Sequence, residues 1–495
     1  MLALTEQRVT VDALSQLAET LQSLDIGPAA SSISADRDRL VGSLRSYLIP
    51  RALDPELPMT VVVAGPTGSG KSTVVNSLAG ADVSPTGALR PTTKKPVVLA
   101  SSRRIADYQV VGGVPCDTYS LDVPTTENLI LVDTPDIDST STRHRAMAEV
   151  IIDNADVVVF VTSALRYADD VPWQILRRAR SRGAPVIHVL NRVQSASVGS
   201  VVDFRSRLSV AGMDDDLVTI SEHHLPEGSG RVPSVAVRPL HERLTAVTDN
   251  REVFATEVFR RVLSATLAQI VELTDTMVSI RDEIDVFEDE MSHRVRERLS
   301  GLELGGIAGD LLPTPPERES GRATRRWKKR AAMITSAAPS AEVRLIEPIV
   351  TAVVADMRDW LVEERQTLEG HGIDPKPVVD GVSAAARSAA EGWVDYVTRI
   401  ALDFDENHAR LGAWVLIDSA IVEEMGPAVA AMFGENGAIL VDRARRELVG
   451  RLEVVYQHAA TLLADILRGR YGEPDETELR ASLAGVTATL APIDA

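Results

Sequence analysis

The segment Gly65-Pro66-Thr67-Gly68-Ser69-Gly70-Lys71-Ser72 constrains the fold of this chain more than any other stretch. It has the spacing G-x-x-x-x-G-K-S, follows the apolar run 61–64 and precedes a helix-like pattern over 73–79. In such a strand–loop–helix unit, glycines let backbone N–H groups surround a phosphate, and the helix adds its positive end. We expect Lys71 to contact the β- and γ-phosphates of a nucleotide and Ser72 to hold Mg²⁺. A glycine turn that matches the motif by chance is disfavoured by both flanks.

Composition limits the class of protein. Of the 495 residues, 44% are hydrophobic and 25% are charged, as in folded proteins, and the net charge is −19. This acidic balance argues against a partner made of nucleic acid. The single cysteine, Cys116, excludes an internal disulfide, suits a reducing cytoplasm and is interpreted as an inert side chain. We find no signal-peptide pattern and no run of 18 apolar residues, so we expect no transmembrane helix.

Hydrophobic periodicity divides the chain into three parts. Residues 1–56 form two helical patterns, which we expect to join a bundle with helices far along the chain. Residues 57–245 alternate apolar runs with helical stretches, which predicts a mostly parallel sheet with helices on both faces. Residues 246–495 predict a helical bundle that starts with a coiled-coil-like seam and is interrupted by a basic loop near 300–340. The expected strands are Thr60–Ala64, Pro96–Ala100, Leu129–Asp133, Val157–Thr162, Val186–Leu190 and Leu217–Ile220.

Two segments after the glycine-rich loop are typical of nucleotide-sensing elements. Residues 90–96 lie about twenty positions after Lys71 and just before an expected strand. A threonine there can complete Mg²⁺ coordination and sense the γ-phosphate; we assign this role to Thr93, with Thr92 as the alternative. Two strand-favouring residues with no such role are the competing interpretation. The apolar run 129–132 ends in Asp133, which can hold the metal through water.

Arg90 stands three residues before Thr93. Gα-type GTPases carry an arginine at that spacing, aimed at the charge of the transition state, and the chain resembles them in that detail. A solvated surface arginine is the alternative. Farther along, Val189-Leu190-Asn191-Arg192-Val193-Gln194 ends an expected strand and stands where a base-recognition motif belongs.

Together these motifs resemble those of P-loop GTPases, in particular bacterial dynamin-like proteins and Era-type relatives. Thr93-Lys94-Lys95-Pro96 is similar to the dynamin switch, and Val132-Asp133-Thr134-Pro135 is similar to the second switch. The stretch from Phe160 to Trp173 looks like that of a dynamin-related group in actinobacteria. The resemblance of motifs covers roughly residues 60–195, and beyond it only the order of N-terminal helices, GTPase domain and helical bundle agrees.

The resemblance implies an α/β P-loop GTPase domain and an all-α helical bundle, with GTP or GDP and Mg²⁺ as ligands. Lys71, Thr93 and Arg90 are then expected to act in hydrolysis, and Ser72, Thr93 and Asp133 to surround the metal. The residues expected to contact the nucleotide are Gly65, Pro66, Thr67, Gly68, Ser69, Gly70, Lys71, Ser72, Thr73, Asp133, Asn191 and Arg192.

Three positions depart from the pattern of this family. Asp136 replaces the glycine that ends the second-switch motif, and a carboxylate beside a phosphate is repulsive, which predicts either slow hydrolysis or a different action of this loop. Gln194 replaces the aspartate that accepts two hydrogen bonds from guanine, which weakens the expected preference for GTP. Gly68 stands where dynamins have a serine, so a hydrogen bond to the nucleotide is missing.

The leading functional hypothesis is a dynamin-like GTPase whose bundle works on a membrane or on another copy, as a homo- or hetero-oligomer. The alternatives are a soluble Era-like regulatory or assembly GTPase and a weakly hydrolysing nucleotide-binding adaptor. We expect a cytoplasmic protein that is peripheral on the inner face of the cell membrane. Two stretches are candidates for lipid contact. The first is the basic segment 322–330 around Trp327, for which a solvated loop or a contact with the acidic surface of another copy is the alternative. The second is the apolar segment 411–441, for which bundle core is the favoured interpretation.

Overall fold

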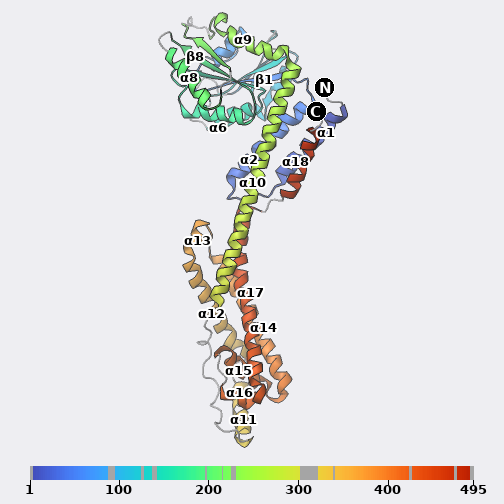
Figure 1. Cartoon of the computed structure of the whole chain (residues 1–495), viewed down its shortest axis with the longest axis vertical. Coiled ribbons are helices and arrows are strands. Elements are labelled where there is room, and N and C mark those ends of the chain that lie inside the picture. Colours follow the sequence, from blue (N-terminus) through green and yellow to red (C-terminus); the bar gives the residue numbers. More distant parts are fainter. Residues whose placement is uncertain are drawn as a thin grey trace. The chain divides into compact units, whose positions relative to one another are not determined.

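The computed structural model describes residues 4–86, 95–123, 128–136, 142–194, 198–213, 216–223, 230–300, 321–337, 341–422, 426–472 and 476–490. The chain forms two compact units (Figure 1). The first, here called the head unit, comprises residues 1–25, 31–276 and 474–495. The second, here called the bundle unit, comprises residues 26–30 and 277–473.

A seven-stranded sheet in the order β5-β2-β6-β1-β7-β8-β9 forms the centre of the head unit. Strand β2 is antiparallel to β6, and the other neighbours are parallel. Every residue of β1, β6 and β7 is buried, as expected of strands covered on both faces. The bounds are β1 Met59–Ala64, β2 Val97–Ala100, β5 Asp117–Ser120, β6 Leu129–Asp133, β7 Val157–Ser163, β8 Val186–Val193 and β9 Leu217–Ser221.

Successive side chains of the strands enter two separate cores, because they point to opposite faces of the sheet. Val62, Val132 and Phe160 pack with helices α6 (Thr142–Asp153), α7 (Asp170–Ser181) and α8 (Val198–Val210). Val61, Val63 and Leu131 pack with helices α4 (Lys71–Ala79) and α9 (Ser234–Asp249). Figure 1 shows α6 and α9 on opposite sides of the sheet. The predicted α/β domain with helices on both faces is confirmed.

Strand β5 and the small hairpin of β3 (Val110–Val111) and β4 (Val114–Pro115) were not predicted. β5 pairs with β2 at the edge of the sheet and is largely exposed, so its sequence Asp-Thr-Tyr-Ser has no apolar pattern that would reveal it. Cys116 lies between β4 and β5, and burial raises the pKa of its thiol to about 11. This agrees with the interpretation of an inert cysteine.

Helices from both ends of the chain complete the head unit. They are α1 (Leu4–Ser23), α2 (Ser31–Ser43), a π-helical turn (Leu44–Leu48), α3 (Ile49–Leu53), the first part of α10 (Arg251–Ser300) and α18 (Glu476–Leu490). The hydroxyls of Thr20 on α1 and Ser482 on α18 are 3.2 Å apart, 462 positions apart in the chain. The helical region passes through Pro50, because proline is tolerated in the first turn of α3. The proposed domain boundaries after residues 56 and 245 stay predictions.

In the part that the structure describes, the bundle unit is helical apart from residues 26–30 and the short turns between helices. It contains the second part of α10, then α11 (Gly321–Ala337), α12 (Ala341–Glu363), α13 (Arg365–Gly370), α14 (Lys376–Phe404), a 3₁₀ turn (Glu406–His408), α15 (Ala409–Val422), α16 (Pro427–Phe433), a second 3₁₀ turn (Gly434–Asn436) and α17 (Gly437–Tyr471). Met277, Phe287 and Met291 of α10 are buried, in agreement with the predicted seam. Trp393 is fully buried and donates from Nε1 to the carbonyl of Ala444 at 2.7 Å.

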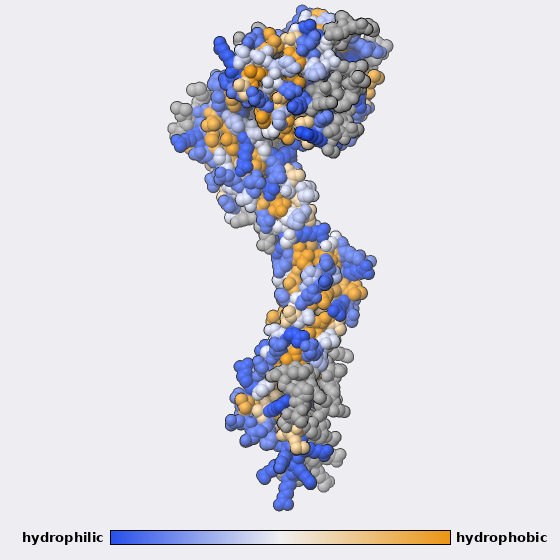
Figure 2. Space-filling model, turned by 180° about the vertical axis from the view of Figure 1, so that it is seen from behind, coloured by the Kyte–Doolittle hydropathy of each residue, from blue (hydrophilic) through white to orange (hydrophobic). Residues whose placement is uncertain are grey.

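The structure corrects the prediction of a basic loop near 300–340. Residues Gly321–Ala337 form a helix, because this stretch contains good helix formers and no interior proline or glycine. Trp327 is 6% exposed and belongs to the bundle core, so it does not offer its ring to a lipid interface. Figure 2 shows hydrophilic surface at the end of the bundle unit where Figure 1 places α11.

The apolar segment after residue 410 is core, as the favoured interpretation predicted. Leu411, Trp414 and Ile417 of α15 and Phe433 of α16 are buried in the bundle. Among the described helices, none combines the length and the apolar character needed to cross a membrane.

Candidate nucleotide-binding site

The glycine-rich loop connects β1 to α4 at the carboxyl end of the parallel strands. Gly70 precedes α4 with a φ of 96°, and Gly65 has a φ of 152°. A Cβ at Gly65 would lie 2.0 Å from the carbonyl oxygen of Val161, and one at Gly70 would lie 2.3 Å from Nδ2 of Asn191. Only glycine fits at these two positions, so the loop lies directly against the backbone of β7 and against the Asn191 side chain of β8. The N–H groups at the start of α4 are those that can receive a phosphate.

Lys71 begins α4 and is 4% exposed. Its Nζ donates to Oδ1 of Asp136 at 2.6 Å and to the carbonyl oxygen of Pro66 at 3.2 Å. Asp136 is itself 6% exposed, so the ion pair is removed from water on both sides. Asp136 was expected to disturb the γ-phosphate; the structure shows that it neutralises the lysine of the loop.

Asp133 ends β6 and lies beside Ser72. Its Oδ2 accepts from the hydroxyl of Ser72 at 2.7 Å and from the hydroxyl of Ser84 at 2.5 Å. Its Oδ1 is buried and has no hydrogen-bond partner among the residues that the structure describes. Burial raises the pKa of the Asp133 carboxyl above its ordinary value, although Lys71 and the hydroxyls of Ser84 and Ser72 act in the opposite direction.

These two groups have the donor chemistry that Mg²⁺ needs. A hard cation prefers carboxylate and hydroxyl oxygens, and it would satisfy the buried Oδ1 of Asp133 directly or through water. Ser72 and Asp133 were predicted as metal-holding residues from separate motifs, and the fold brings them together. The third predicted ligand, Thr93, lies outside the described residues, together with Thr92 and Arg90.

Asn191 lies near the end of β8 and is 4% exposed. Its Nδ2 donates to the carbonyl of Ser69 at 2.8 Å, and its Oδ1 accepts from the backbone N–H of Arg192 at 2.9 Å. Arg192 has a φ of 56°, a left-handed conformation that side chains rarely adopt. Gln194 is exposed and donates from Nε2 to the carboxylate of Glu222 at 2.6 Å. The segment predicted to recognise the base is therefore hydrogen-bonded to the glycine-rich loop.

Three residues at the site were missed by the motifs. Arg166, after β7, donates from Nη1 to the carbonyl of Thr67 at 2.8 Å. Ser84 contacts Asp133, and Asn76 of α4 holds Ser84 by bonding its backbone N–H at 2.8 Å and its carbonyl at 2.9 Å. The position of Arg166 just after β7 could have indicated its contact with the loop, because the carboxyl ends of adjacent parallel strands meet at one edge of the sheet. Nothing in the spacing of Ser84 indicates its contact.

Comparison with known proteins identifies this part of the chain. Residues 60–192 match the family model described as 50S ribosome-binding GTPase. These residues are a P-loop GTPase domain. The predicted resemblance to P-loop GTPases is thereby confirmed over the segment that carries the motifs.

One curated relative and two solved structures illustrate the range of the similarity. The Arabidopsis thaliana protein described as a probable chloroplastic transmembrane GTPase, FZO-like, is 29% identical over 154 residues, which are 30% of this chain and 16% of that protein. Era from Aquifex aeolicus bound to GDP and AlF4⁻ is 18% identical, over 39% of this chain and 57% of that one, with a TM-score of 0.27. An oligomerised bacterial dynamin pair, described as sensing and tethering membranes, is 13% identical over 98% of this chain and 94% of that one, with a TM-score of 0.37.

Proposed function

We propose that this chain is a dynamin-like GTPase that binds and slowly hydrolyses GTP with Mg²⁺ and uses its helical bundle on an anionic membrane or on another copy of itself. The observation that carries the nucleotide part is the convergence of Lys71, Ser72 and Asp133 at the carboxyl edge of the sheet, inside the segment that matches the GTPase family. The membrane and assembly parts follow from the motif resemblance and from the surface of the bundle unit.

Each residue of the site has a distinct task in this proposal. The backbone N–H groups of residues 67–72 surround the phosphates, and Lys71 supplies a positive charge to them. Ser72 and Asp133 hold Mg²⁺, which neutralises phosphate charge when bound. Arg166 keeps the loop in place through the carbonyl of Thr67. Thr93 and Arg90 are proposed to complete the metal site and to stabilise the transition state.

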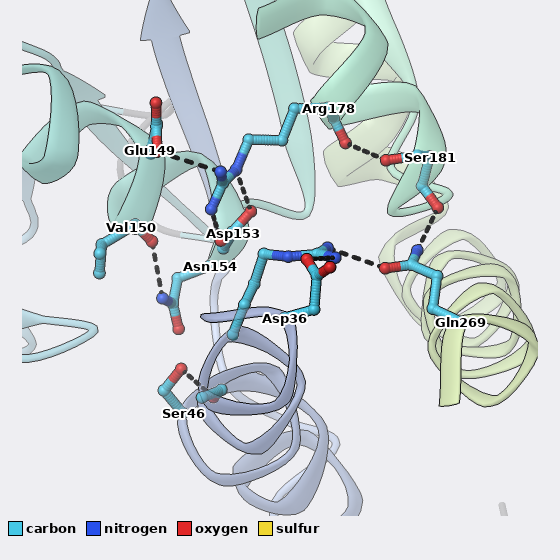
Figure 3. A network of polar contacts seen from close by, with 11 residues as sticks. Asp36, Ser46, Glu149, Val150, Asp153, Asn154, Arg178, Ser181 and Gln269 are labelled. Atoms are coloured by element: carbon cyan, nitrogen blue, oxygen red, sulfur yellow. Dashed lines mark hydrogen bonds and ion pairs between the residues drawn. The ribbon is translucent and has the colours of Figure 1, made fainter. Parts of the chain in front are cut away.

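A connected set of polar contacts supports coupling of the nucleotide site to the helices. Helix α6 follows the second-switch segment, and Arg178 of α7 holds it through Glu149 at 3.0 Å and Asp153 at 2.6 Å (Figure 3). In the same region, Arg39 of α2 donates to Gln269 of α10 at 2.8 Å, and Gln269 donates to the carbonyl of Ser181 at 2.8 Å. A shift of α6 on nucleotide exchange would therefore act on helices α7, α2 and α10 together.

The outer face of α11 supports a membrane partner. Arg325, Arg326, Lys329 and Arg330 are exposed, whereas Trp327, on the same helix, is buried in the core. Each exposed cation near an anionic leaflet contributes about 1 kcal/mol of attraction. Contact with lipid would accordingly be electrostatic, without an inserted ring, and sensitive to salt.

The weakly hydrolysing adaptor is the second candidate, and one observation favours it. The ammonium group of Lys71, which a nucleotide phosphate would contact, is already paired with the carboxylate of Asp136. Such an adaptor would bind nucleotide with low affinity and show no turnover above that of a Lys71→Ala variant.

GTP turnover measured at several protein concentrations, with and without anionic and neutral liposomes, tests the proposal. We expect slow Mg²⁺-dependent turnover that rises with protein concentration or with anionic vesicles and is absent in Lys71→Ala. Turnover equal to that of Lys71→Ala under every condition would favour the adaptor. Turnover that changes neither with protein concentration nor with liposomes would favour a soluble regulatory GTPase.

A further inference from the structure

The lysine of the phosphate-binding loop already has an anion as its partner. Oδ1 of Asp136 lies 2.6 Å from Nζ of Lys71, and both side chains are buried. The two residues are 65 positions apart, and Asp136 stands where the second-switch motif of GTPases has a glycine. A glycine offers no carboxylate, so this pair is a property of the present chain.

A carboxylate in this place opposes the binding of a nucleotide. Asp133 and Asp136 are two buried carboxylates, and Lys71 is the one buried ammonium group that contacts either of them in the described part of the site. A phosphate that approaches Lys71 must either displace the carboxylate of Asp136 or lie beside it. Displacement breaks a buried ion pair, and adjacency places like charges together in a medium of low dielectric constant.

We infer that Asp136 is the residue that sets nucleotide affinity in this chain, because its carboxylate competes with the nucleotide phosphates for Nζ of Lys71. The inference rests on the proposed nucleotide-binding function and adds a determinant to it. The nucleotide-free form is stabilised by the pair, and nucleotide binding requires Asp136 to leave. Removing the charge of Asp136 while keeping its shape then releases Lys71 for the phosphates.

Four variants of this chain test the inference. Asp136→Asn removes the charge with little change of shape, Asp136→Gly restores the residue of the family motif, and Asp136→Glu keeps the charge. Asp249→Asn, at the exposed end of α9, makes the same change of net charge away from the loop. Affinities are measured by fluorescence titration with N-methylanthraniloyl derivatives of GDP and GTP in Mg²⁺, and thermal unfolding is recorded without nucleotide.

We expect Asp136→Asn and Asp136→Gly to bind both nucleotides at least about tenfold more tightly than the wild type, since a buried charge–charge contact is worth this much or more. Asp249→Asn should stay near the wild-type affinity, and Asp136→Glu, which keeps the charge, should gain less than Asp136→Asn. Without nucleotide, Asp136→Asn should unfold at a lower temperature than Asp136→Glu, because it leaves the ammonium of Lys71 without its anion. If Asp136→Gly does not fold, Asp136→Asn decides.

Any other pattern of affinities contradicts the inference, the proposed function or both. Equal affinity of the wild type and Asp136→Asn would refute the inference and leave the proposed function standing. An equal gain in Asp249→Asn would show a general charge effect and would also refute it. Binding by Asp136→Asn but not by the wild type would support the inference and remove the proposed function. Binding by none of the proteins would overturn both.

Discussion

Asn191 donates a hydrogen bond from its side-chain amide to the carbonyl oxygen of Ser69, at 2.8 Å, across 122 positions of the chain. The strand end that we expect to contact the base is thereby held to the loop that we expect to contact the phosphates. Gly70 allows this approach, because any Cβ there would meet the same amide at 2.3 Å. The two halves of the proposed nucleotide site are thus coupled without any ligand.

Replacing Asn191 by alanine should weaken the binding of GTP and ATP alike. The buried carbonyl of Ser69 loses its donor, which costs about 1–3 kcal/mol and frees the loop. Titration with both nucleotides checks this, and Asn407→Ala, at an exposed asparagine of the bundle unit, is the control. A loss for GTP only would mean that Asn191 serves base recognition and not the loop.

Gln194→Asp should raise the preference for GTP over ATP. A carboxylate accepts two N–H groups of guanine, whereas the amide of Gln194 accepts only one. Gln194 lies 2.6 Å from a carboxylate oxygen of Glu222, so the aspartate should be combined with Glu222→Gln to avoid like-charge repulsion. The measurement is the ratio of dissociation constants for GTP and ATP in the double variant and in Glu222→Gln alone. An unchanged ratio would remove residues 191–194 from base recognition.

Lys71→Ala should abolish nucleotide binding, because the loop then lacks the charge that meets the phosphates. Ser72→Ala should weaken binding in Mg²⁺ and leave binding in EDTA unchanged, since its hydroxyl acts on the metal. Ser46→Ala, on the exposed face of the N-terminal helices, is the matched control. Calorimetric titration with nucleotide in the Mg²⁺ buffer and in the EDTA buffer measures both affinities. A similar loss of affinity in EDTA would show that Ser72 acts on the loop itself.

Asp156→Asn should destabilise the chain by about 3–5 kcal/mol, as expected when a buried ion pair loses one partner. Asp156 is fully buried before β7; it accepts from the hydroxyl of Tyr47 at 2.7 Å, from the N–H of Thr60 at 2.6 Å and from the guanidinium of Arg51. Urea unfolding measures the loss, with the exposed Asp107→Asn as the control. A loss below 1 kcal/mol would show that the cluster is not a joint between the N-terminal helices and the sheet.

Changing Arg325, Arg326, Lys328 and Lys329 to glutamate should abolish co-sedimentation with anionic liposomes, and wild-type binding should fall with salt. The control variant carries the same change of net charge elsewhere on the bundle unit. In it, glutamate replaces four exposed basic residues of α12, α13 and α14, namely Arg358, Arg365, Lys376 and Arg399. Trp327→Ala should cost about 3–5 kcal/mol of stability, because its ring fills the core. Wild type that stays in solution with both GTP and GDP would leave the soluble regulatory GTPase as the better account.

The nucleotide loop, the central strands and the long helix α10 were predictable because each is encoded by neighbouring residues. Val61–Ala64 is an uninterrupted apolar run, Gly65–Ser72 has a fixed spacing, and the seam of α10 repeats every three or four positions. Apolar runs, motif spacings and helical periodicity can be recognised without knowing how distant parts of the chain pack. Even the pairing of Ser72 with Asp133 could be inferred, since parallel strands end at a common edge.

Other features depend on residues that meet only in the folded chain. Strand β5 has a polar sequence and exists because β2 offers an unpaired edge. Helix α11 turns Trp327 inward, since α15 supplies a buried apolar surface, whereas the sequence alone suggested an aromatic residue for lipid. The replacement of a glycine by Asp136 can be read from the motif alone. The contact of its carboxylate with Lys71 cannot, because the two residues are 65 positions apart and meet only through the packing of β6 and α4.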